Sequence, residues 1–280
     1  MLVDSPANPL VKTLRSLEQA KHRKALKQFL VEGVRLVEDG LRAGYWPDIC
    51  LYNPDLLTRT ERGQRLLSRL HEMTNNRRTV PIEATERALE AASGTQHPQG
   101  IVAACALIDW PPPSPRLAAR ALFVICDNIQ DPGNLGTLLR TAEAAGADAA
   151  WVSPGCVDPF SPKVVRAAMG AHFRLPLYRR DWPEIAQAMQ DAGIAADRVF
   201  ATAASSHMAY DIVDWTGPSV LIISNEAHGL SLDAARLTNQ VLAIPMQGDT
   251  ESLNAATSAA VILFEAARQR RAAEGTASGG

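Results

Sequence analysis

The chain has 280 residues, 46% of them hydrophobic, and a formal net charge of −2 at pH 7. This length allows two domains of ordinary size, each with its own core. No apolar run approaches twenty residues and no basic stretch precedes an apolar one at the N-terminus, so we expect a cytoplasmic protein without a membrane span or secretory signal. The four cysteines are widely spaced and form no C-x-x-C pair, which argues against a disulfide framework and against any metal site.

The first hundred residues predict a small α/β module. Apolar runs of strand length alternate with segments of helical periodicity. The expected strands are 29–31, 49–52 and 100–106, and the expected helices are 35–43 and 64–72. Residues 109–115 read Asp-Trp-Pro-Pro-Pro-Ser-Pro, and such a run cannot continue a helix or occupy a central strand because proline lacks the N–H donor. We therefore predict a domain at 1–108 and a linker at 109–116.

The positive charge is concentrated in this module. Residues 1–100 carry 15 Lys and Arg against 12 Asp and Glu, whereas the remainder carries 13 against 18. The densest part comprises Lys21, Arg23, Lys24 and Lys27, which are candidate contacts for RNA phosphates. An excess this small also fits an ordinary solvated helix face, and that alternative stays open.

After the linker, the pattern predicts a doubly wound parallel sheet. Residues 121–126 form a continuous apolar run, which is typical of a strand buried on both faces. Further strands are expected at 149–152, 175–178, 199–203, 220–224 and 242–245, and helices at 135–145, 162–170, 184–192 and 254–271. This alternation predicts an α/β domain at 117–272, followed by a small, polar, disordered tail at 273–280.

Three polar loops follow predicted strands of this domain, at 127–136, 223–230 and 245–254. The carboxyl ends of parallel strands are where open α/β sheets bind ligands. Asn254 is a good N-cap residue for the helix that follows it, so backbone N–H groups should be available there. The G-x-G-x-x-G spacing is absent, which argues against a nicotinamide-dependent oxidoreductase. Glu226 and His228 in the second loop also fit ordinary structural roles.

Together, the loops resemble the motifs of the SpoU family of S-adenosylmethionine-dependent RNA ribose methyltransferases. The first motif is matched by Asn134, Gly136, Arg140-Thr141-Ala142 and Gly146, and the second by Asn225, Glu226 and Gly229, with Ser224 where the family usually has glycine. The third is matched by Ile244-Pro245-Met246 and Ser252-Leu253-Asn254. Upstream, Phe29-Leu30-Val31-Glu32-Gly33 and His97-Pro98-Gln99-Gly100-Ile101 are similar to the family's N-terminal substrate-binding domain, which is related to kink-turn-binding ribosomal proteins.

The resemblance implies a trefoil-knotted catalytic domain that binds S-adenosylmethionine and transfers its methyl group to a ribose 2′-hydroxyl. By correspondence, the cofactor-binding residues are Thr202, Ser224, Glu226, Gly229, Ile244, Met246 and Leu253. The catalytic residues are Arg140, Asn134, Glu226, Ser252 and Asn254. A guanidinium holds its proton tightly, so we expect Arg140 to grip phosphate or stabilise an alkoxide, although the family's arginine is often described as a general base.

The resemblance also indicates the partners. RNA is the substrate, and large-subunit ribosomal RNA is the first choice because the N-terminal domain resembles domains that recognise folded RNA. A homodimer through the C-terminal domain is expected, with the small residues of 254–271 facing the partner or, alternatively, the chain's own core. A transfer RNA 2′-O-methyltransferase and an inactive RNA-binding assembly factor remain alternatives.

Overall fold

The structure is a computed structural model that describes residues 2–75, 79–95, 98–113, 120–203, 206–225, 229–250 and 252–277. Its contacts divide the chain into two compact units. The first unit contains Met1–Asp109 and Phe160–Phe173, and the second contains Trp110–Pro159 and Arg174–Gly280. Within the described residues, even the longest helices lack the apolar length needed to cross a membrane.

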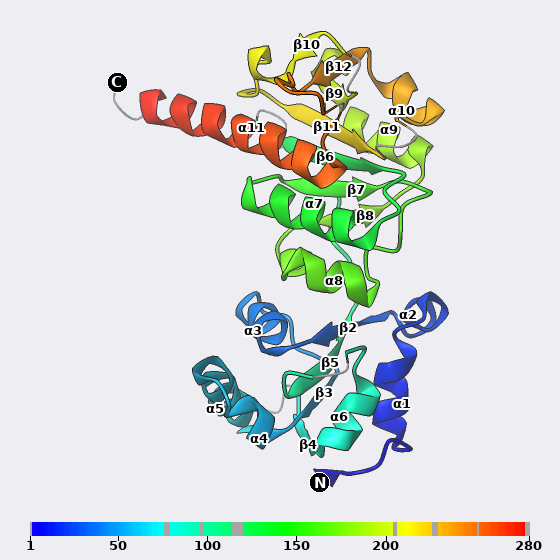
Figure 1. Cartoon of the computed structure of the whole chain (residues 1–280), viewed down its shortest axis with the longest axis vertical. Coiled ribbons are helices and arrows are strands. Elements are labelled where there is room, and N and C mark those ends of the chain that lie inside the picture. The colour runs from blue at the N-terminus through cyan, green and yellow to red at the C-terminus, as the bar shows by residue number, and fades with distance from the viewer. Residues whose placement is uncertain are drawn as a thin grey trace. The chain divides into compact units, whose positions relative to one another are not determined.

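The first unit is built on a mixed five-stranded sheet with helices on both faces (Figure 1). The strand order is β1 (Leu2–Val3), β4 (Ile82–Ala84), β3 (Ile49–Tyr52), β5 (Ile101–Ala106) and β2 (Gln28–Glu32). The helices are α1 (Pro9–Ser16), α2 (Ala20–Leu26), α3 (Val34–Arg42), α4 (Pro54–Leu57), α5 (Glu61–Asn75) and α6 (Glu86–Ala92). The predicted strands and helices of this module are confirmed, whereas α1, α2, α4, α6, β1 and β4 were not predicted.

Alternation along the strands gives this unit two apolar cores. On β2, Phe29 and Val31 pack with α3 and α5, while Leu30 points to the opposite face and packs with α1 and α6. The same division holds on β5, where Ile101 belongs to the first core and Val102 to the second. Because successive side chains of a strand point to opposite faces, a sheet covered on both sides needs apolar residues at every position.

Phe160–Phe173 joins the first unit although its sequence position assigns it to the domain predicted at 117–272. It contains α8 (Pro162–Ala168), which starts at the predicted proline, and a 3-10 turn, η2 (Ala171–Phe173). The ring of Phe173 lies 5.9 Å from that of Phe29, centroid to centroid. A Cβ on Gly40 of α3 would lie 3.1 Å from the Phe173 ring, so the absence of a side chain there permits this close packing.

The second unit is built on a seven-stranded parallel sheet, which confirms the predicted parallel sheet and adds the strand β10, which was not predicted. The order is β10 (Met208–Ala209), β12 (Gln240–Ala243), β9 (Val199–Thr202), β11 (Ser219–Ser224), β6 (Leu122–Asp127), β7 (Ala149–Val152) and β8 (Leu177–Arg179). Strand β11 lies between β6 and β9, although β9 precedes it in the sequence. Strands β6 and β11 are buried along their whole length, which explains their continuous apolar runs.

The helices of this unit are α7 (Pro132–Ala144), α9 (Trp182–Asp191), α10 (Leu232–Leu237) and α11 (Ala255–Ala277). Helices α7 and α11 pack against each other (Figure 1). Helix α11 continues to Ala277, so the structure differs from the disordered tail predicted from 273 onward, and only 278–280 lie outside the described residues. Its alanine stripe, including Ala256, Ala259 and Leu263, is buried within the chain's own core. The stripe therefore gives no support for a partner helix.

Candidate active site

The parallel strands of the second unit bring the three predicted loops to one edge of the sheet. Strands β6, β11 and β12, which precede the three loops, end at Asp127, Ser224 and Ala243, and the neighbouring β9 ends at Thr202. Ser224 lies opposite Asp127 in the strand register, and Thr202 lies opposite Leu242 of β12. The loops that follow these strands therefore converge at the carboxyl edge, where α/β sheets bind their ligands.

The first loop positions Asn134 and Arg140 by opening helix α7. Asp131 is the N-cap residue, and its carboxylate accepts the N–H of Asn134 at 2.7 Å. Pro132 occupies the first helical turn, where its missing N–H has no cost. The side chain of Arg140 is exposed further along the same helix, where solvent or a substrate can reach it.

A side-chain hydrogen bond joins the first and third loops. The amide nitrogen of Asn254 donates to Oδ1 of Asn134 at 2.8 Å. The Oδ1 atom of Asn254 accepts the N–H groups of Ala256 at 2.9 Å and Thr257 at 3.4 Å, so Asn254 also caps α11 as its sequence predicted. Two residues from motifs 120 positions apart thus meet at the starts of two packed helices.

Cys156 holds the first loop by hydrogen bonds to its backbone, a role that was not predicted from the sequence. Its Sγ accepts the N–H of Ile129 at 3.2 Å and donates to the carbonyl of Cys126 at 3.2 Å. The N–H of Val157 also donates to the carbonyl of Ile129 at 2.9 Å. Burial raises the pKa of the Cys156 thiol, which fits a supporting group better than a nucleophile.

The second loop leaves β11 at Ser224, whose side chain is buried. The structure gives Ser224 no positive φ, so a serine in place of the family's glycine imposes no backbone strain. Asn225 and Gly229 form a bridge, with the Gly229 N–H donating to the Asn225 carbonyl at 2.9 Å. Glu226, predicted for both catalysis and cofactor binding, lies outside the described residues, as does His228.

Asp127 was missed as a functional candidate. It is 1% exposed, and its Oδ2 accepts the N–H of Ser231, the residue that caps α10, at 2.8 Å. Burial raises the pKa of the Asp127 carboxyl, while the hydrogen bonds from Ser231 oppose that rise. An acidic residue directly after the apolar run 121–126 was the available signal in the sequence.

The third loop places apolar side chains beside these polar groups. Ile244 and Leu253 are half-buried, Met246 is 37% exposed and Ser252 is exposed. Thr202, at the end of β9, is also half-buried. The edge therefore offers partly exposed apolar side chains and loop backbone to a ligand with both apolar and polar parts, which fits S-adenosylmethionine. In the part of the chain that the structure describes, no group of three His, Cys, Asp or Glu side chains is arranged to hold a metal ion.

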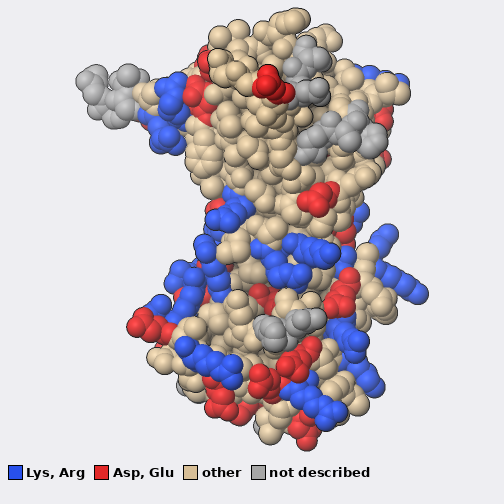
Figure 2. All heavy atoms as spheres, in the orientation of Figure 1, with Lys and Arg blue, Asp and Glu red and all other residues tan. Residues whose placement is uncertain are grey.

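The basic cluster of the first unit is only partly on the surface. Lys21, Lys24 and Lys27 are exposed on or just after α2, and Figure 2 shows Lys and Arg gathered over α2, α3 and α5. Arg23 is 4% exposed, and its guanidinium donates to the carbonyls of Leu17 at 2.7 Å and Glu18 at 2.8 Å. The prediction that Arg23 contacts RNA is therefore corrected, because its donors bond to the backbone after α1.

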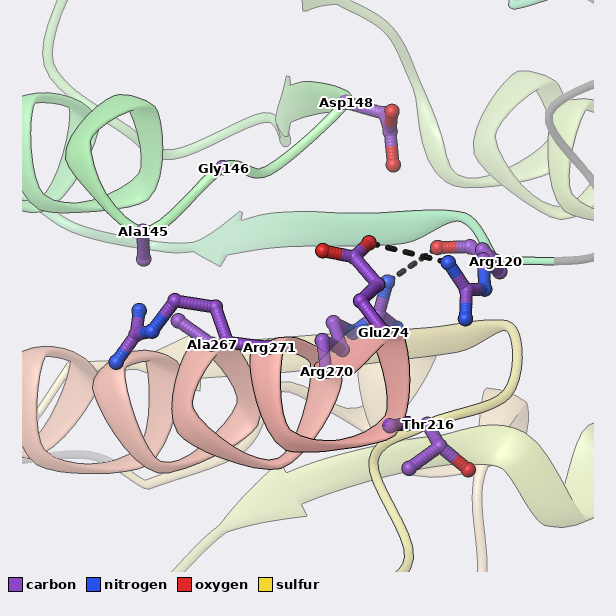
Figure 3. Close-up of a pocket in the computed structure, with 10 residues that line it drawn as sticks. Arg120, Ala145, Gly146, Asp148, Thr216, Ala267, Arg270, Arg271 and Glu274 are labelled. Atoms are coloured by element: carbon purple, nitrogen blue, oxygen red, sulfur yellow. Dashed lines mark hydrogen bonds and ion pairs between the residues drawn. The ribbon is translucent and has the colours of Figure 1, made fainter. Parts of the chain in front are cut away.

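A cavity of about 320 Å³ lies away from these loops, at the amino edge of the sheet (Figure 3). Its wall includes Arg120, Asp148, Arg270 and Glu274, with Arg120 and Glu274 paired at 3.0 Å. The guanidinium of Arg270 donates to the carbonyls of Arg120, Ala121 and Gly217. These bonds tie α11 to the segments that enter β6 and β11, which is a structural arrangement.

Comparison with known proteins identifies the family. Residues 121–264 match the SpoU rRNA Methylase family, and residues 8–103 match the MRM3-like substrate binding domain. The chain belongs to the SpoU rRNA methylase family. It is 32% identical over 265 residues to the 23S rRNA (guanosine(2553)-2′-O)-methyltransferase RlmP of Bacillus subtilis, covering 94% of this chain and 97% of that one.

Solved structures of SpoU methylases are also similar. The AdoMet-bound rRNA methyltransferase from Sinorhizobium meliloti has a TM-score of 0.81 at 31% identity, covering 96% of this chain and 97% of that one. AviRb from Streptomyces viridochromogenes, in complex with the cofactor AdoMet, has a TM-score of 0.77 at 28% identity, covering 95% and 100%. The predicted α/β fold, the enzyme class of RNA 2′-O-ribose methyltransferase and the cofactor S-adenosylmethionine are thereby confirmed.

Proposed function

We propose that this SpoU methylase methylates a ribose 2′-hydroxyl of large-subunit ribosomal RNA at the carboxyl edge of its parallel sheet. The observation that carries the proposal is the hydrogen bond between Asn134 and Asn254, which unites the first and third motifs at the starts of α7 and α11. Relatives of similar length from Bacillus subtilis and Streptomyces viridochromogenes are named as 23S rRNA 2′-O-methyltransferases, which favours the same substrate class here.

S-adenosylmethionine supplies an electrophilic methyl group when bound. The chain's own contribution is to hold it with the loop backbone near Thr202, Ser224, Glu226, Gly229, Ile244, Met246 and Leu253. Asn134, Glu226, Ser252 and Asn254 would form the polar surroundings of the reacting hydroxyl. Positioning of the hydroxyl against the methyl group should supply much of the rate acceleration.

Arg140 would act as a fixed cation. It is exposed on α7, the helix whose first turn contains Asn134, and a guanidinium keeps its proton under all ordinary conditions. It is therefore suited to bidentate contact with an RNA phosphate and to stabilising the oxyanion that forms as the 2′-hydroxyl loses its proton. A role as general base would require loss of that proton and is disfavoured.

The first unit would capture the RNA. Its match to a substrate binding domain and the exposed Lys21, Lys24 and Lys27 support this role.

We also propose that the second unit contains a trefoil knot, consistent with the insertion of β11 between β6 and β9. A homodimer through the C-terminal domain remains part of the proposal, with the 48% exposed Phe264 of α11 as its contact. A cytoplasmic location is also part of the proposal.

Transfer of label from S-adenosylmethionine to RNA tests the proposal. Purified protein, labelled cofactor and protein-free large-subunit ribosomal RNA should give 2′-O-methylated nucleotides, and ribose-methylation mapping should show that mark lost in cells without the protein. Label confined to transfer RNA would support the alternative substrate. Cofactor binding without transfer to any RNA would instead support an inactive assembly factor.

A further inference from the structure

Asp127 occupies a position where a parallel sheet rarely tolerates a charge. It is the last residue of β6, it lies opposite Ser224 of β11, and it is 1% exposed. Burying a carboxylate is costly unless its oxygens receive hydrogen bonds. Its Oδ2 accepts the Ser231 N–H at 2.8 Å, whereas its buried Oδ1 has no hydrogen-bond partner among the described residues. The folded chain thus retains a carboxylate where an apolar side chain would fit the strand better.

The bond to Ser231 joins two of the three loops. Asp127 stands at the start of the first loop, and Ser231 is the N-cap residue of α10, just after the second loop. The second loop leaves β11 at Ser224, and Gly229 forms a bridge with Asn225. The Asp127 carboxylate therefore fixes the point at which the chain enters α10.

We propose that Asp127 is a positioning residue for methyl transfer, whose carboxylate holds Ser231, and with it the adjoining Gly229 and Leu230, beside the end of β6, so that Gly229 and the first loop meet S-adenosylmethionine in one arrangement. This rests on the proposed placement of the cofactor at the carboxyl edge. The carboxylate does not take part in the chemistry. It fixes the backbone of Ser231 before the cofactor binds, which lowers the free-energy cost of binding.

Two variants at position 231 isolate the hydrogen bond. Ser231 has φ of −65°, which proline adopts readily, so Ser231→Pro removes the N–H with little change in backbone angle. It also removes the Oγ, which accepts the Ala234 N–H at 3.2 Å and bonds to the Asp127 carboxylate, whereas Ser231→Ala removes this hydroxyl but keeps the N–H. Isothermal titration with S-adenosylmethionine should show Ser231→Ala binding more tightly than Ser231→Pro, which should bind about tenfold more weakly than the native chain, as expected for loss of bonds to a charged group.

Substitutions at position 127 complete the test. Asp127→Ala should weaken cofactor binding about tenfold, and adding Ser231→Pro to it should weaken binding by less than a further twofold, because both remove the same bond. Asp127→Asn keeps an acceptor oxygen and should bind more tightly than Asp127→Ala. The kcat at saturating cofactor should stay within about threefold in each variant, because a positioning residue acts through the loop.

Melting curves verify that every variant is folded at the temperature of titration. Equal affinities of Ser231→Pro and Ser231→Ala, additive losses in the double variant, or Asp127→Asn binding as weakly as Asp127→Ala would each overturn the proposal. Failure of the native chain to bind S-adenosylmethionine would overturn the proposed function instead, so the two failures are distinguishable.

Discussion

Polar side chains form different kinds of hydrogen bond at the two edges of the seven-stranded sheet. At the amino edge, side chains bond to the backbone of the segments entering the strands: Arg270 to the carbonyl of Gly217, Arg198 to that of Pro218 at 2.8 Å, and Asp148 to the Leu122 N–H at 2.8 Å. At the carboxyl edge, the loops bond chiefly to one another, as in the Asn134 to Asn254 pair. The comparison teaches that the first edge stabilises the sheet, while the second leaves backbone groups for a ligand.

The largest effect is expected at the carboxyl edge, from Arg140→Ala. Loss of a preorganised cation that stabilises developing charge should lower kcat by about a hundredfold to a thousandfold. Affinity for S-adenosylmethionine should stay within a few fold, because the partner of Arg140 is RNA. Single-turnover methylation and titration of the cofactor measure the two quantities. A lost binding heat would mean that Arg140 helps to build the cofactor pocket.

The amino edge should respond in stability and not in binding. Arg270→Met keeps much of the side-chain volume but removes the guanidinium's hydrogen bonds to three carbonyls, two of which keep a bond from Ser219, so the free energy of unfolding should fall by about 2 kcal/mol. Denaturant unfolding measures this, and the affinity for S-adenosylmethionine at low temperature should stay within about twofold. Arg271→Met, at an exposed neighbouring residue, is the control. A cofactor affinity lowered in step with stability would erase the distinction between the edges.

Asn254 connects stability and binding, and two variants separate them. Asn254→Asp keeps the Oδ1 cap of α11 but loses the donor to Asn134, whereas Asn254→Ala loses both. Only Asn254→Ala should lower the free energy of unfolding by about 1 kcal/mol, the usual contribution of an N-cap. Both should lower methyl transfer. Native activity in Asn254→Asp would show that the bond between the two motifs is dispensable.

The smallest effect is expected in the first unit, on α2. Replacing Lys21, Lys24 and Lys27 with alanine should weaken RNA binding and reduce the slope of log affinity against log salt by about 2, since each phosphate contact releases a counterion. The triple variant of the exposed arginines Arg59, Arg65 and Arg87 is a control of equal charge. An identical change of slope in both would indicate general attraction to RNA in place of a defined surface.

Features that depend on residues close together in the sequence could be predicted. The run 121–126 identified a doubly buried strand, and Asn254 identified the start of α11, because burial pattern and capping depend on neighbouring residues. Arg23 was misread because its burial depends on carbonyls at the end of α1, a helix that was itself not predicted. Asp127 became a candidate only when the structure placed it opposite Ser224 and within hydrogen-bond distance of the Ser231 N–H. The roles that could not be predicted are those set by tertiary contacts.

The position of Phe160–Phe173 has a consequence for synthesis of the chain. Its Val165 and Phe173 complete the apolar core formed by Phe29, Val37 and Leu66, yet Phe173 is translated 64 residues after Asp109. At bacterial or eukaryotic elongation rates of roughly 5 to 20 residues per second, the N-terminal core waits about 3 to 13 seconds for its last side chains. During that interval, the growing chain must carry an unfinished apolar surface, which makes it a natural client of chaperones that bind nascent chains.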